Sequence, residues 1–373
     1  MRRKLSVTGA LSTVAGTGIA GYSGDGGLAK SAQLNYTAGV AVDASGNIYV
    51  SDSWFSVIRM VTKSTGIITT IAGTVYNHGY AGDGGLATSA SLYGPQGLAL
   101  DTSGNIYVAD ARNNRIRKIT KSTGIITTVA GTGTAGYSGN GGPAIAATLR
   151  YPIGVAVDSL GNIFVADFFN YAIRKITKST GIITTVAGTG LKGYSGDEGH
   201  ATLASLGRPV DVAIYLSSYM FISDPDNGAI RVITLSTGNI TSATIVGHPA
   251  AVISDSSGNI FILDNYNGTI YMINSTLNSF SIVAGTGVRG YSGDGGLATL
   301  SDLNRPFKMA VDNSDTVYYT DSGSHRVRSF SVPTTTTTSS AIPNYMSVGL
   351  YNPVWWISAS LLLLMWQPHT CSN

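Results

Sequence analysis

The sequence predicts an all-β fold, a six-bladed β-propeller of four-stranded antiparallel blades, and three observations lead to it. One phrase recurs six times along residues 13–332, and each copy closes a strand-like run with an aspartate. These aspartates are Asp52, Asp110, Asp167, Asp224, Asp264 and Asp321, with spacings of 58, 57, 57, 40 and 57 residues. A period of that size, made of short β-prone runs and glycine turns, is typical of propeller blades. No run carries the 3.6-residue period of a helix.

Each copy contains four β-prone runs. In the second copy they cover residues 97–100, 105–109, 115–119 and 125–130, and Gly, Ser, Asn and Asp separate them. Because the turns are short, consecutive runs should be antiparallel neighbours. The first two runs are apolar at nearly every position, which indicates a sheet covered on both faces.

The two ends of the repeat region predict how the ring closes. The last copy supplies three runs and ends near Phe330, where Pro333 and a threonine tract replace the expected fourth run. Residues 10–16 match that missing run. We therefore expect the N-terminal strand to complete the sixth blade, which removes an exposed sheet edge. The predicted propeller spans residues 10–332.

The core of each copy, as in YPIGVAVDSLGNIFVADFFNYAIRKIT from Tyr151, resembles the NHL repeat. The GYSGDGG segments between copies are similar to those of the teneurin-type NHL propeller. The departures are local: Thr37 replaces a proline, Asp211 a glycine and Tyr215 an aspartate, and the fifth copy is short. The resemblance implies a binding platform for proteins, glycans or RNA. It leaves open a metal-dependent enzyme, because a minority of such propellers are amidating lyases.

Two sets of repeated aspartates are predicted to be structural. The GYSGDGG segments each offer one carboxylate, at Asp25, Asp83, Asp197 and Asp294, and one copy has Asn140 instead. A calcium site needs six or more oxygen ligands, so we expect an Asx-type cap on a short helix with the tyrosine packed across the loop. The aspartates that end the second strands recur in every copy. A pair of catalytic carboxylates would not be repeated six times, so a catalytic role is not expected. These aspartates are expected to hydrogen-bond the following turn.

Function is expected where equivalent positions differ between copies. Aromatic residues replace small polar ones in several loops after the second strand, and the first strands carry different residues where they begin. The candidate binding residues are Trp54, Phe55, Gln96, Arg112, Phe168, Phe169, Tyr171, Asp211, Tyr266, Phe307, Lys308 and His325. They predict a protein or glycan ligand on this loop face. The alternative is that the aromatic residues pack on neighbouring blades.

Two further function classes are weighed against this one. His78, His200, His248 and His325 all fall in loops assigned to the same face, where three histidines would suit a catalytic zinc. They share no spacing, so we predict no metal, no cofactor and no enzyme activity. A cytosolic RNA-binding module would use basic residues such as Arg112, Arg115, Lys192, Arg289 and Lys308. The net charge is only +3, and no nucleic acid is expected.

The C-terminal residues change in composition. Residues 333–344 form a Thr/Ser/Pro-rich stalk, and residues 345–366 are hydrophobic and uncharged. This segment is interpreted as a membrane anchor or a lipid-anchor signal, with a disordered end as the alternative. Display at a cell surface follows, although no N-terminal signal peptide is recognisable. The possible N-glycosylation sites are Asn35, Asn239, Asn267 and Asn274.

Overall fold

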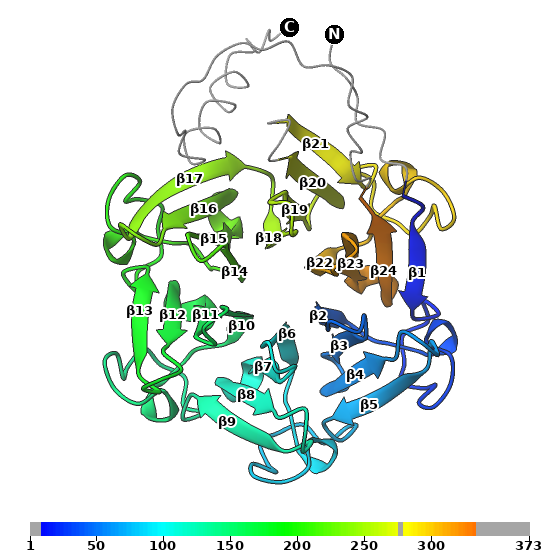
Figure 1. Ribbon diagram of the computed structural model, residues 1–373, viewed down its shortest axis with the longest axis horizontal. Coiled ribbons are helices and arrows are strands. Elements are labelled where there is room, and N and C mark those ends of the chain that lie inside the picture. Colours follow the sequence, from blue (N-terminus) through cyan, green and yellow to red (C-terminus); the bar gives the residue numbers. More distant parts are fainter. Residues whose placement is uncertain (1–8, 275–278, 333–373) are drawn as a thin grey trace, which may run out of the picture.

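The computed structural model describes residues 9–274 and 279–332. They form a closed ring of six four-stranded antiparallel sheets around a central axis (Figure 1). Blade 1 contains β2 (Thr37–Val42), β3 (Ile48–Asp52), β4 (Val57–Val61) and β5 (Ile68–Ala72). Blade 2 contains β6 (Pro95–Leu100), β7 (Ile106–Asp110), β8 (Arg115–Ile119) and β9 (Ile126–Ala130). Blade 3 contains β10 (Pro152–Val157), β11 (Ile163–Asp167), β12 (Ala172–Ile176) and β13 (Ile183–Ala187).

The other three blades repeat this order. Blade 4 contains β14 (Asp211–Tyr215), β15 (Tyr219–Asp224), β16 (Ala229–Thr234) and β17 (Asn239–Ile245). Blade 5 contains β18 (Pro249–Ser254), β19 (Ile260–Asp264), β20 (Thr269–Asn274) and β21 (Ser279–Ala284). Blade 6 contains β22 (Pro306–Val311), β23 (Thr316–Asp321), β24 (Arg326–Ser331) and β1 (Ser12–Ala15). The predicted six-bladed propeller is confirmed.

Short 3-10 helices occupy the connections. In the links between blades they are η1 (Ala29–Ser31), η2 (Ala87–Ser89), η4 (Ala144–Ala146), η6 (Ala201–Leu203) and η8 (Ala298–Leu300). After the second strands they are η3 (Ala111–Asn113), η5 (Phe168–Asn170), η7 (Pro225–Asn227) and η9 (Ser322–Ser324).

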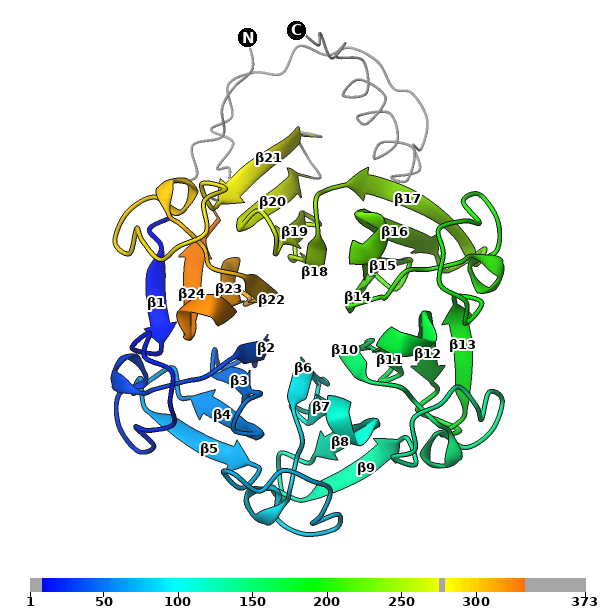
Figure 2. The same cartoon turned by 180° about the vertical axis from the view of Figure 1, so that it is seen from behind.

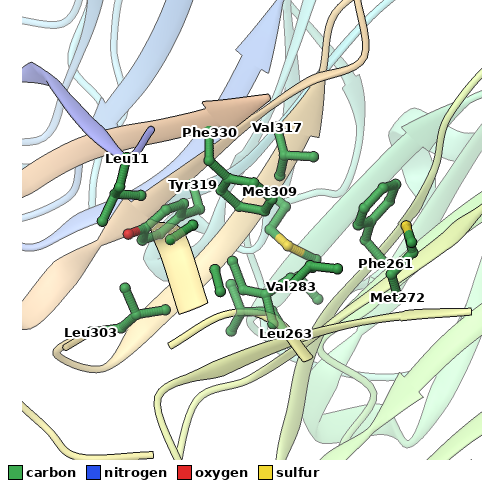
Figure 3. Packing of buried hydrophobic residues seen from close by; sticks show 14 of the residues in the cluster. Leu11, Phe261, Leu263, Met272, Val283, Leu303, Met309, Val317, Tyr319 and Phe330 are labelled. Atoms are coloured by element: carbon green, nitrogen blue, oxygen red, sulfur yellow. The ribbon is translucent and has the colours of Figure 1, made fainter. Parts of the chain in front are cut away.

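Ring closure follows the prediction. β1 pairs antiparallel with β24, so that Ser12 lies opposite Ser329 and Ala15 opposite Val327. Leu11 is fully buried in the apolar cluster between blades 5 and 6, where Figure 3 shows it near Tyr319 and Phe330. The first strand of the chain is therefore also part of the core.

The links between blades do not stay on the loop face. Each GYSGDGG-type link reaches the outer rim and pairs with the start of an outer strand, as both views show (Figures 1 and 2). In blade 1, Gly26 N–H donates to Ile68 O at 2.8 Å, and Ile68 N–H donates to Gly27 O at 3.0 Å. We call these stretches the covering segments; they are residues 24–32, 82–90, 139–147, 196–204 and 293–301.

The predicted Asx cap is wrong, because the covering-segment aspartates bind an arginine instead. Asp83 accepts from Arg117 Nη2 at 2.5 Å, from Thr128 N–H at 3.0 Å and from the Tyr80 hydroxyl at 2.8 Å. The tyrosine packs as predicted, with its ring centroid 4.8 Å from the guanidinium carbon. None of the 3-10 helices in the Asp-containing links of blades 1, 2 and 6 has a side-chain cap.

The fully buried arginines of the third strands are the centre of this arrangement, which we call the arginine clamp. They are Arg59, Arg117, Arg174, Arg231 and Arg328. Blades 1, 2, 4 and 6 pair the arginine with a covering-segment aspartate at 2.5–2.8 Å. Since each guanidinium also donates to carbonyls of the link, the clamp fixes the link to its blade.

The aspartates that end the second strands are structural in the described blades. Asp110 accepts from Tyr93 N–H, at the entry of the blade, at 2.8 Å and from Asn113 Nδ2, in the following turn, at 2.8 Å. Burial raises the pKa of Asp110 to about 6 and that of Asp52 to about 7, against the opposing effect of these hydrogen bonds and the clamp arginine. The predicted bond to the following turn is thus present, together with one that was not predicted.

In the described residues no helix is both long and apolar enough to cross a membrane. The predicted stalk at 333–344 and hydrophobic segment at 345–366 lie outside the described residues.

Candidate binding site on the loop face

The mouth of the central channel is asymmetric. Blades 1, 2 and 3 have Gly39, Gly97 and Gly154 at equivalent positions of the first strand. A Cβ on Gly39 would lie 2.2 Å from Gln96 O, and one on Gly97 would lie 2.5 Å from Ile153 O, so no side chain fits there. Blade 4 has Asp211, blade 5 has Ala251 and blade 6 has Lys308.

Asp211 and Lys308 form a buried ion pair across this mouth. Lys308 Nζ lies 2.6 Å from Asp211 Oδ1 and donates to Val210 O at 2.7 Å. Burial raises the pKa of Asp211 and lowers that of Lys308, while their attraction opposes both shifts. A cavity of about 350 Å³ runs along the first strands of the blades from this pair. Because each charge is already neutralised, the pair shapes the mouth rather than offering a free charge to a ligand.

A ring of residues surrounds the mouth, one from each blade, at the equivalent position that precedes the recurring proline or threonine at the entry to the first strand. Its members, the loop-face ring, are Tyr36, Gly94, Tyr151, Arg208, His248 and Arg305. Tyr36, Tyr151 and Arg305 have φ of 55°, 56° and 49°, in the left-handed region where blade 2 uses glycine. Bulky side chains held in this conformation, directly before proline or threonine, cost conformational energy. Such strain points to a role for the side chains.

Aromatic and arginine side chains gather beside the ring on blades 2 to 4. Tyr151 lies with its ring centroid 6.1 Å from Phe168 and 5.7 Å from Phe169, and these two phenylalanines meet edge-on at 4.8 Å. Arg150 lies over Phe169 at 5.5 Å, and Arg208 over Phe168 at 5.4 Å. Side chains of this type dominate the energetics of protein interfaces.

Arg112 extends the cluster toward blade 1. Its Nη1 donates to the Tyr93 hydroxyl at 3.2 Å, and its guanidinium lies 5.0 Å from that ring centroid. Burial and Tyr151 raise the pKa of Tyr36, whereas Arg305 and Arg112 lower it. These four groups therefore lie within electrostatic reach of one another across the mouth.

The charge around the mouth is positive. Asp226 is paired with Arg208 at 2.7 Å and Lys192 at 2.8 Å. The exposed Arg112, Arg150 and Arg305 form no ion pair with any described residue. The loop face thus offers three arginines to an external anion, next to aromatic rings.

The structure separates the predicted binding residues into groups. Arg112, Phe168 and Phe169 belong to the cluster. Trp54 is 64% exposed on blade 1, and Tyr266, which lies under Arg289 with 4.6 Å between centroid and guanidinium, is 65% exposed on blade 5. Neither contacts the cluster through a bond or ring contact among the described residues.

Other predicted residues lie at the mouth or close to it. Phe307 lies beside Lys308, with its ring centroid 5.7 Å from the ammonium. His325 and Tyr171 end 3-10 turns with φ of 52° and 53°, and His325 Nδ1 accepts from Tyr36 N–H at 3.5 Å. Burial and Arg326 lower the pKa of His325.

Two of the predicted residues serve packing. Phe55 is only 5% exposed and packs between the rings of Tyr22 and Tyr76. Gln96 is also 5% exposed and donates to Ser53 Oγ at 3.1 Å. For these two residues the packing alternative holds.

Sequence reasoning missed most of the loop-face ring. It compared the loops after the second strands and the positions inside the first strand, but not the residue before that strand. Tyr36, Tyr151 and Arg305 stand directly before a threonine or proline that recurs in the copies. Comparing that column, where tyrosine, arginine and histidine alternate with glycine, would have found them.

The histidines do not form a metal site. His78 Nδ1 bonds Ser56 Oγ at 2.8 Å on the loop face, whereas His200 pairs with Asn239 at the outer rim. The expectation that all four share a face is wrong for His200. Within residues 9–274 and 279–332, no three His, Cys, Asp or Glu side chains are close enough to hold an ion.

The predicted glycosylation sites differ in accessibility. Asn239 is exposed and Asn35 is half-buried, whereas Asn274 is 7% exposed. Asn267 donates through Nδ2 to Asp264 Oδ2 at 2.8 Å. Asn239 therefore offers the most accessible acceptor, and glycosylation stays a prediction.

Comparison with known proteins finds a likeness to NHL-repeat proteins. The Teneurin NHL domain model matches residues 13–80 and 74–137, and the NHL repeat model matches residues 149–176. Over these residues the chain is similar to the Teneurin NHL domain and to the NHL repeat. It is 28% identical to Teneurin-1 of Gallus gallus over 325 residues, which cover 78% of this chain and 10% of that protein. It spans less than half the length of three relatives that it matches, which are Teneurin-1 and NHL repeat-containing protein 2 of Gallus gallus and Protein SUPPRESSOR OF QUENCHING 1 of Arabidopsis thaliana.

Solved structures share the fold of this chain. A protein of unknown function from Bacteroides thetaiotaomicron superposes with a TM-score of 0.65 at 16% identity, covering 87% of this chain and 76% of that chain. A gluconolactonase from Xanthomonas campestris superposes with a TM-score of 0.56 at 12% identity, covering 88% and 91%. At these identities the likeness extends to the fold alone.

Proposed function

We propose that this NHL propeller is a non-catalytic interaction module whose loop face binds an anionic protein or glycan ligand. The observation that carries the proposal is the loop-face ring, where Tyr36, Tyr151 and Arg305 are kept in strained conformations around the channel mouth. Arginine and aromatic side chains give large contact areas and charge-assisted hydrogen bonds, which suit a ligand with carboxylate or sulfate groups.

The test uses the full chain on arrays of acidic peptides and of sulfated or carboxylated glycans. We expect binding that weakens with salt, because exposed arginines supply it. Replacing both Arg112 and Arg305 with alanine should weaken binding at least about tenfold, the equivalent of about 1.4 kcal/mol. Lys30→Ala removes a charge from the covering segment of blade 1, away from the ring, and is the matched control.

The arrays distinguish the two ligand classes, and two results would contradict the proposal. One is binding that the Arg112/Arg305 double variant retains in full. The other is stronger binding to single-stranded RNA than to any acidic peptide or glycan, which would favour the RNA-binding alternative.

The likeness to the Teneurin NHL domain and to Teneurin-1 supports a non-catalytic role over a lyase-like enzyme. A zinc content near one ion per chain, lost in a His78/His248 double variant, would reverse this preference.

We also propose display at a membrane surface, on the basis of the uncharged sequence at 345–366. The full chain should then sediment with membranes and resist carbonate extraction, whereas a chain that ends before Pro333 should be released. Recovery of the full chain as a monodisperse species without detergent would contradict membrane display.

A further inference from the structure

Blade 5 is the only blade in the described structure without a covering segment. Three residues, 246–248, connect β17 to β18, where the other links carry a GYSGDGG-type loop. The outer strand β21 therefore has no partner of the kind that pairs with β5, β9, β13, β17 and β1. Within residues 9–274 and 279–332, β21 is the open edge of a four-stranded sheet.

The arginine clamp is lost together with the segment. Tyr271 stands at the position of the clamp arginine, as its pairing with Ile282 shows, because Arg59 pairs with Thr70 at the same place. In blade 1 the Thr70 N–H donates to a covering-segment aspartate. In blade 5 the residue equivalent to Thr70 is Ile282, and the residue equivalent to the clamp arginine is Tyr271. An aspartate in a covering segment would therefore find no cation at this place.

This change leaves apolar side chains exposed on blade 5. Phe280 pairs with Ile273 as Ile68 pairs with Val61, so Phe280 and Ile68 are equivalent. Ile68 is fully buried under its covering segment, whereas Phe280 is 42% exposed and Ile282 is 45% exposed. Tyr271 stacks on Phe280 with centroids 5.0 Å apart and ring planes 10° apart. The three side chains form an apolar strip along the edge.

The backbone N–H and C=O groups along the outer edge of β21 could also pair with another strand. In blade 1 both the N–H and the C=O of Ile68 bond to the covering segment. No described residue bonds to the equivalent outward groups of Phe280. β21 contains no charged residue and no proline, the features by which edge strands ordinarily resist pairing.

We propose that the edge of blade 5 binds one extended segment of a partner polypeptide, which takes the place of the missing covering segment. The molecule supplies the template five times: a glycine-containing stretch that pairs with the start of the outer strand. Strand addition of this kind obtains affinity from backbone bonds and selectivity from side-chain contacts.

The structure also indicates the chemistry of this segment. Where the template has an aspartate facing the clamp arginine, the partner should have an apolar residue facing Tyr271 and Ile282. The neighbouring outer strands, β17 and β1, both carry covering segments (Figure 1), so the edge of β21 lies between two projections of the rim. A single extended chain fits between them better than the broad rim of a second copy.

The experiment uses peptides built on the chain's own template, residues 290–303 (GYSGDGGLATLSDL). One peptide has this sequence, a second carries Asp294→Leu, and a third adds Gly295→Pro, which removes the N–H that donates to Leu11 O in blade 6. Hydrogen exchange of residues 279–284 in the full chain is measured with each peptide. We expect the Asp294→Leu peptide to slow the exchange at least about tenfold, and both other peptides to have little effect.

Two protein variants complete the test. Ile282→Asp places a charge on the edge and should abolish the protection, whereas Leu86→Asp, at another exposed position, on the covering segment of blade 2, should not. Both must keep the melting temperature of the parent; if Ile282→Asp does not, Ile282→Lys replaces it.

Three results would overturn the proposal. The first is no protection by the Asp294→Leu peptide at millimolar concentration. The second is protection without peptide in a chain that light scattering shows to be a dimer, which assigns the edge to a second copy. The third is protection without peptide in a monomer, which assigns it to another part of the same chain.

Discussion

The outer rim of this propeller repeats one set of contacts from blade to blade, whereas the loop face has different residues at equivalent positions. At the rim, four blades repeat the same contacts between a buried arginine, an aspartate and a tyrosine, with arginine–aspartate distances of 2.5–2.8 Å. At the channel mouth, equivalent positions hold glycine, aspartate, alanine or lysine, and the loop-face ring mixes tyrosine, arginine, histidine and glycine. At the rim these contacts hold a link to its blade, so they recur in the blades that carry a covering segment with an aspartate. The mouth presents one surface, so each blade contributes something different.

The difference has a practical consequence for reading repeats. A charged residue that recurs at one position, such as the clamp arginine, is explained by a contact that each blade makes. A charged residue that occurs once at its position, such as Lys308 or Asp211, is explained by what surrounds the axis. The predictions below test the rim and the mouth separately, beginning with the contact that closes the ring.

The largest effect is expected from removing the strand that closes the ring. Deleting residues 1–18 removes β1 together with Leu11, opens the edge of β24 and leaves Asp294 without its bond from Thr13 N–H. We expect the melting temperature to fall by more than about 10 °C, and the protein to aggregate through the open edge. Calorimetry and light scattering measure both. An unchanged melting temperature would show that the ring does not depend on β1.

At the mouth, the test is a double-mutant cycle on the buried ion pair. Lys308→Met leaves Asp211 buried without a counter-ion, and Asp211→Leu does the same to Lys308, so each should cost about 3–5 kcal/mol of unfolding free energy. The double variant should lose less than either single variant, because no lone charge remains. Denaturant unfolding measures the cycle. Additive losses would mean that the two groups act independently.

How much of this was visible in the sequence differs between the two regions. The period, the four runs per copy and the match of residues 10–16 to a missing strand predicted the architecture, because these signals repeat. The clamp was missed, since Arg117 and Asp83 lie 34 residues apart and no local pattern joins them. The ion pair was missed for the same reason, because Asp211 and Lys308 are 97 residues apart and only the closed ring brings them together.

The buried aspartates at the ends of the second strands predict that the unfolding free energy depends on pH. Burial raises the pKa of Asp52 to about 7 and that of Asp110, Asp167 and Asp321 to about 6, above the value of about 3.9 in an unfolded chain. The folded state therefore binds more protons between pH 4 and pH 6–7.

The unfolding free energy should accordingly rise as the pH falls from 7 to 5, by up to about 1.4 kcal/mol per pH unit for each such group. Asp110→Asn should reduce this slope, which urea unfolding at several pH values measures. Below pH 4 the trend should reverse. Burial opposes ionisation of the covering-segment Asp83, but hydrogen bonds from Thr128 and Tyr80 and the charge of Arg117 leave its pKa lowered. A slope of the opposite sign between pH 5 and 7 would contradict the prediction.

The smallest effect, and the sharpest test of the rim, concerns blade 3, where the clamp is incomplete. Asn140 Oδ1 accepts from Thr185 N–H at 2.5 Å, but no bond joins Asn140 to Arg174 among the described residues, and a cavity of about 310 Å³ lies beside them. In blade 2 the corresponding carboxylate also accepts from the clamp arginine and the tyrosine hydroxyl.

Asn140→Asp should therefore complete the clamp and raise the unfolding free energy by about 1 kcal/mol at pH 7. Hydrogen bonds to charged groups contribute about 1.5–3 kcal/mol, and partial exposure of the carboxylate reduces this gain. Since the new carboxylate should have a lowered pKa, like Asp83, the gain should be fully present above about pH 4 and should be lost as the pH falls further, through the lowered pKa. Asp83→Asn, the reverse change in blade 2, should cost a similar amount. The prediction is contradicted if Asn140→Asp and Asp83→Asn both destabilise the protein. In that case blade 3 is stabilised by the asparagine amide itself, and the clamp is not the same contact in every blade that has it.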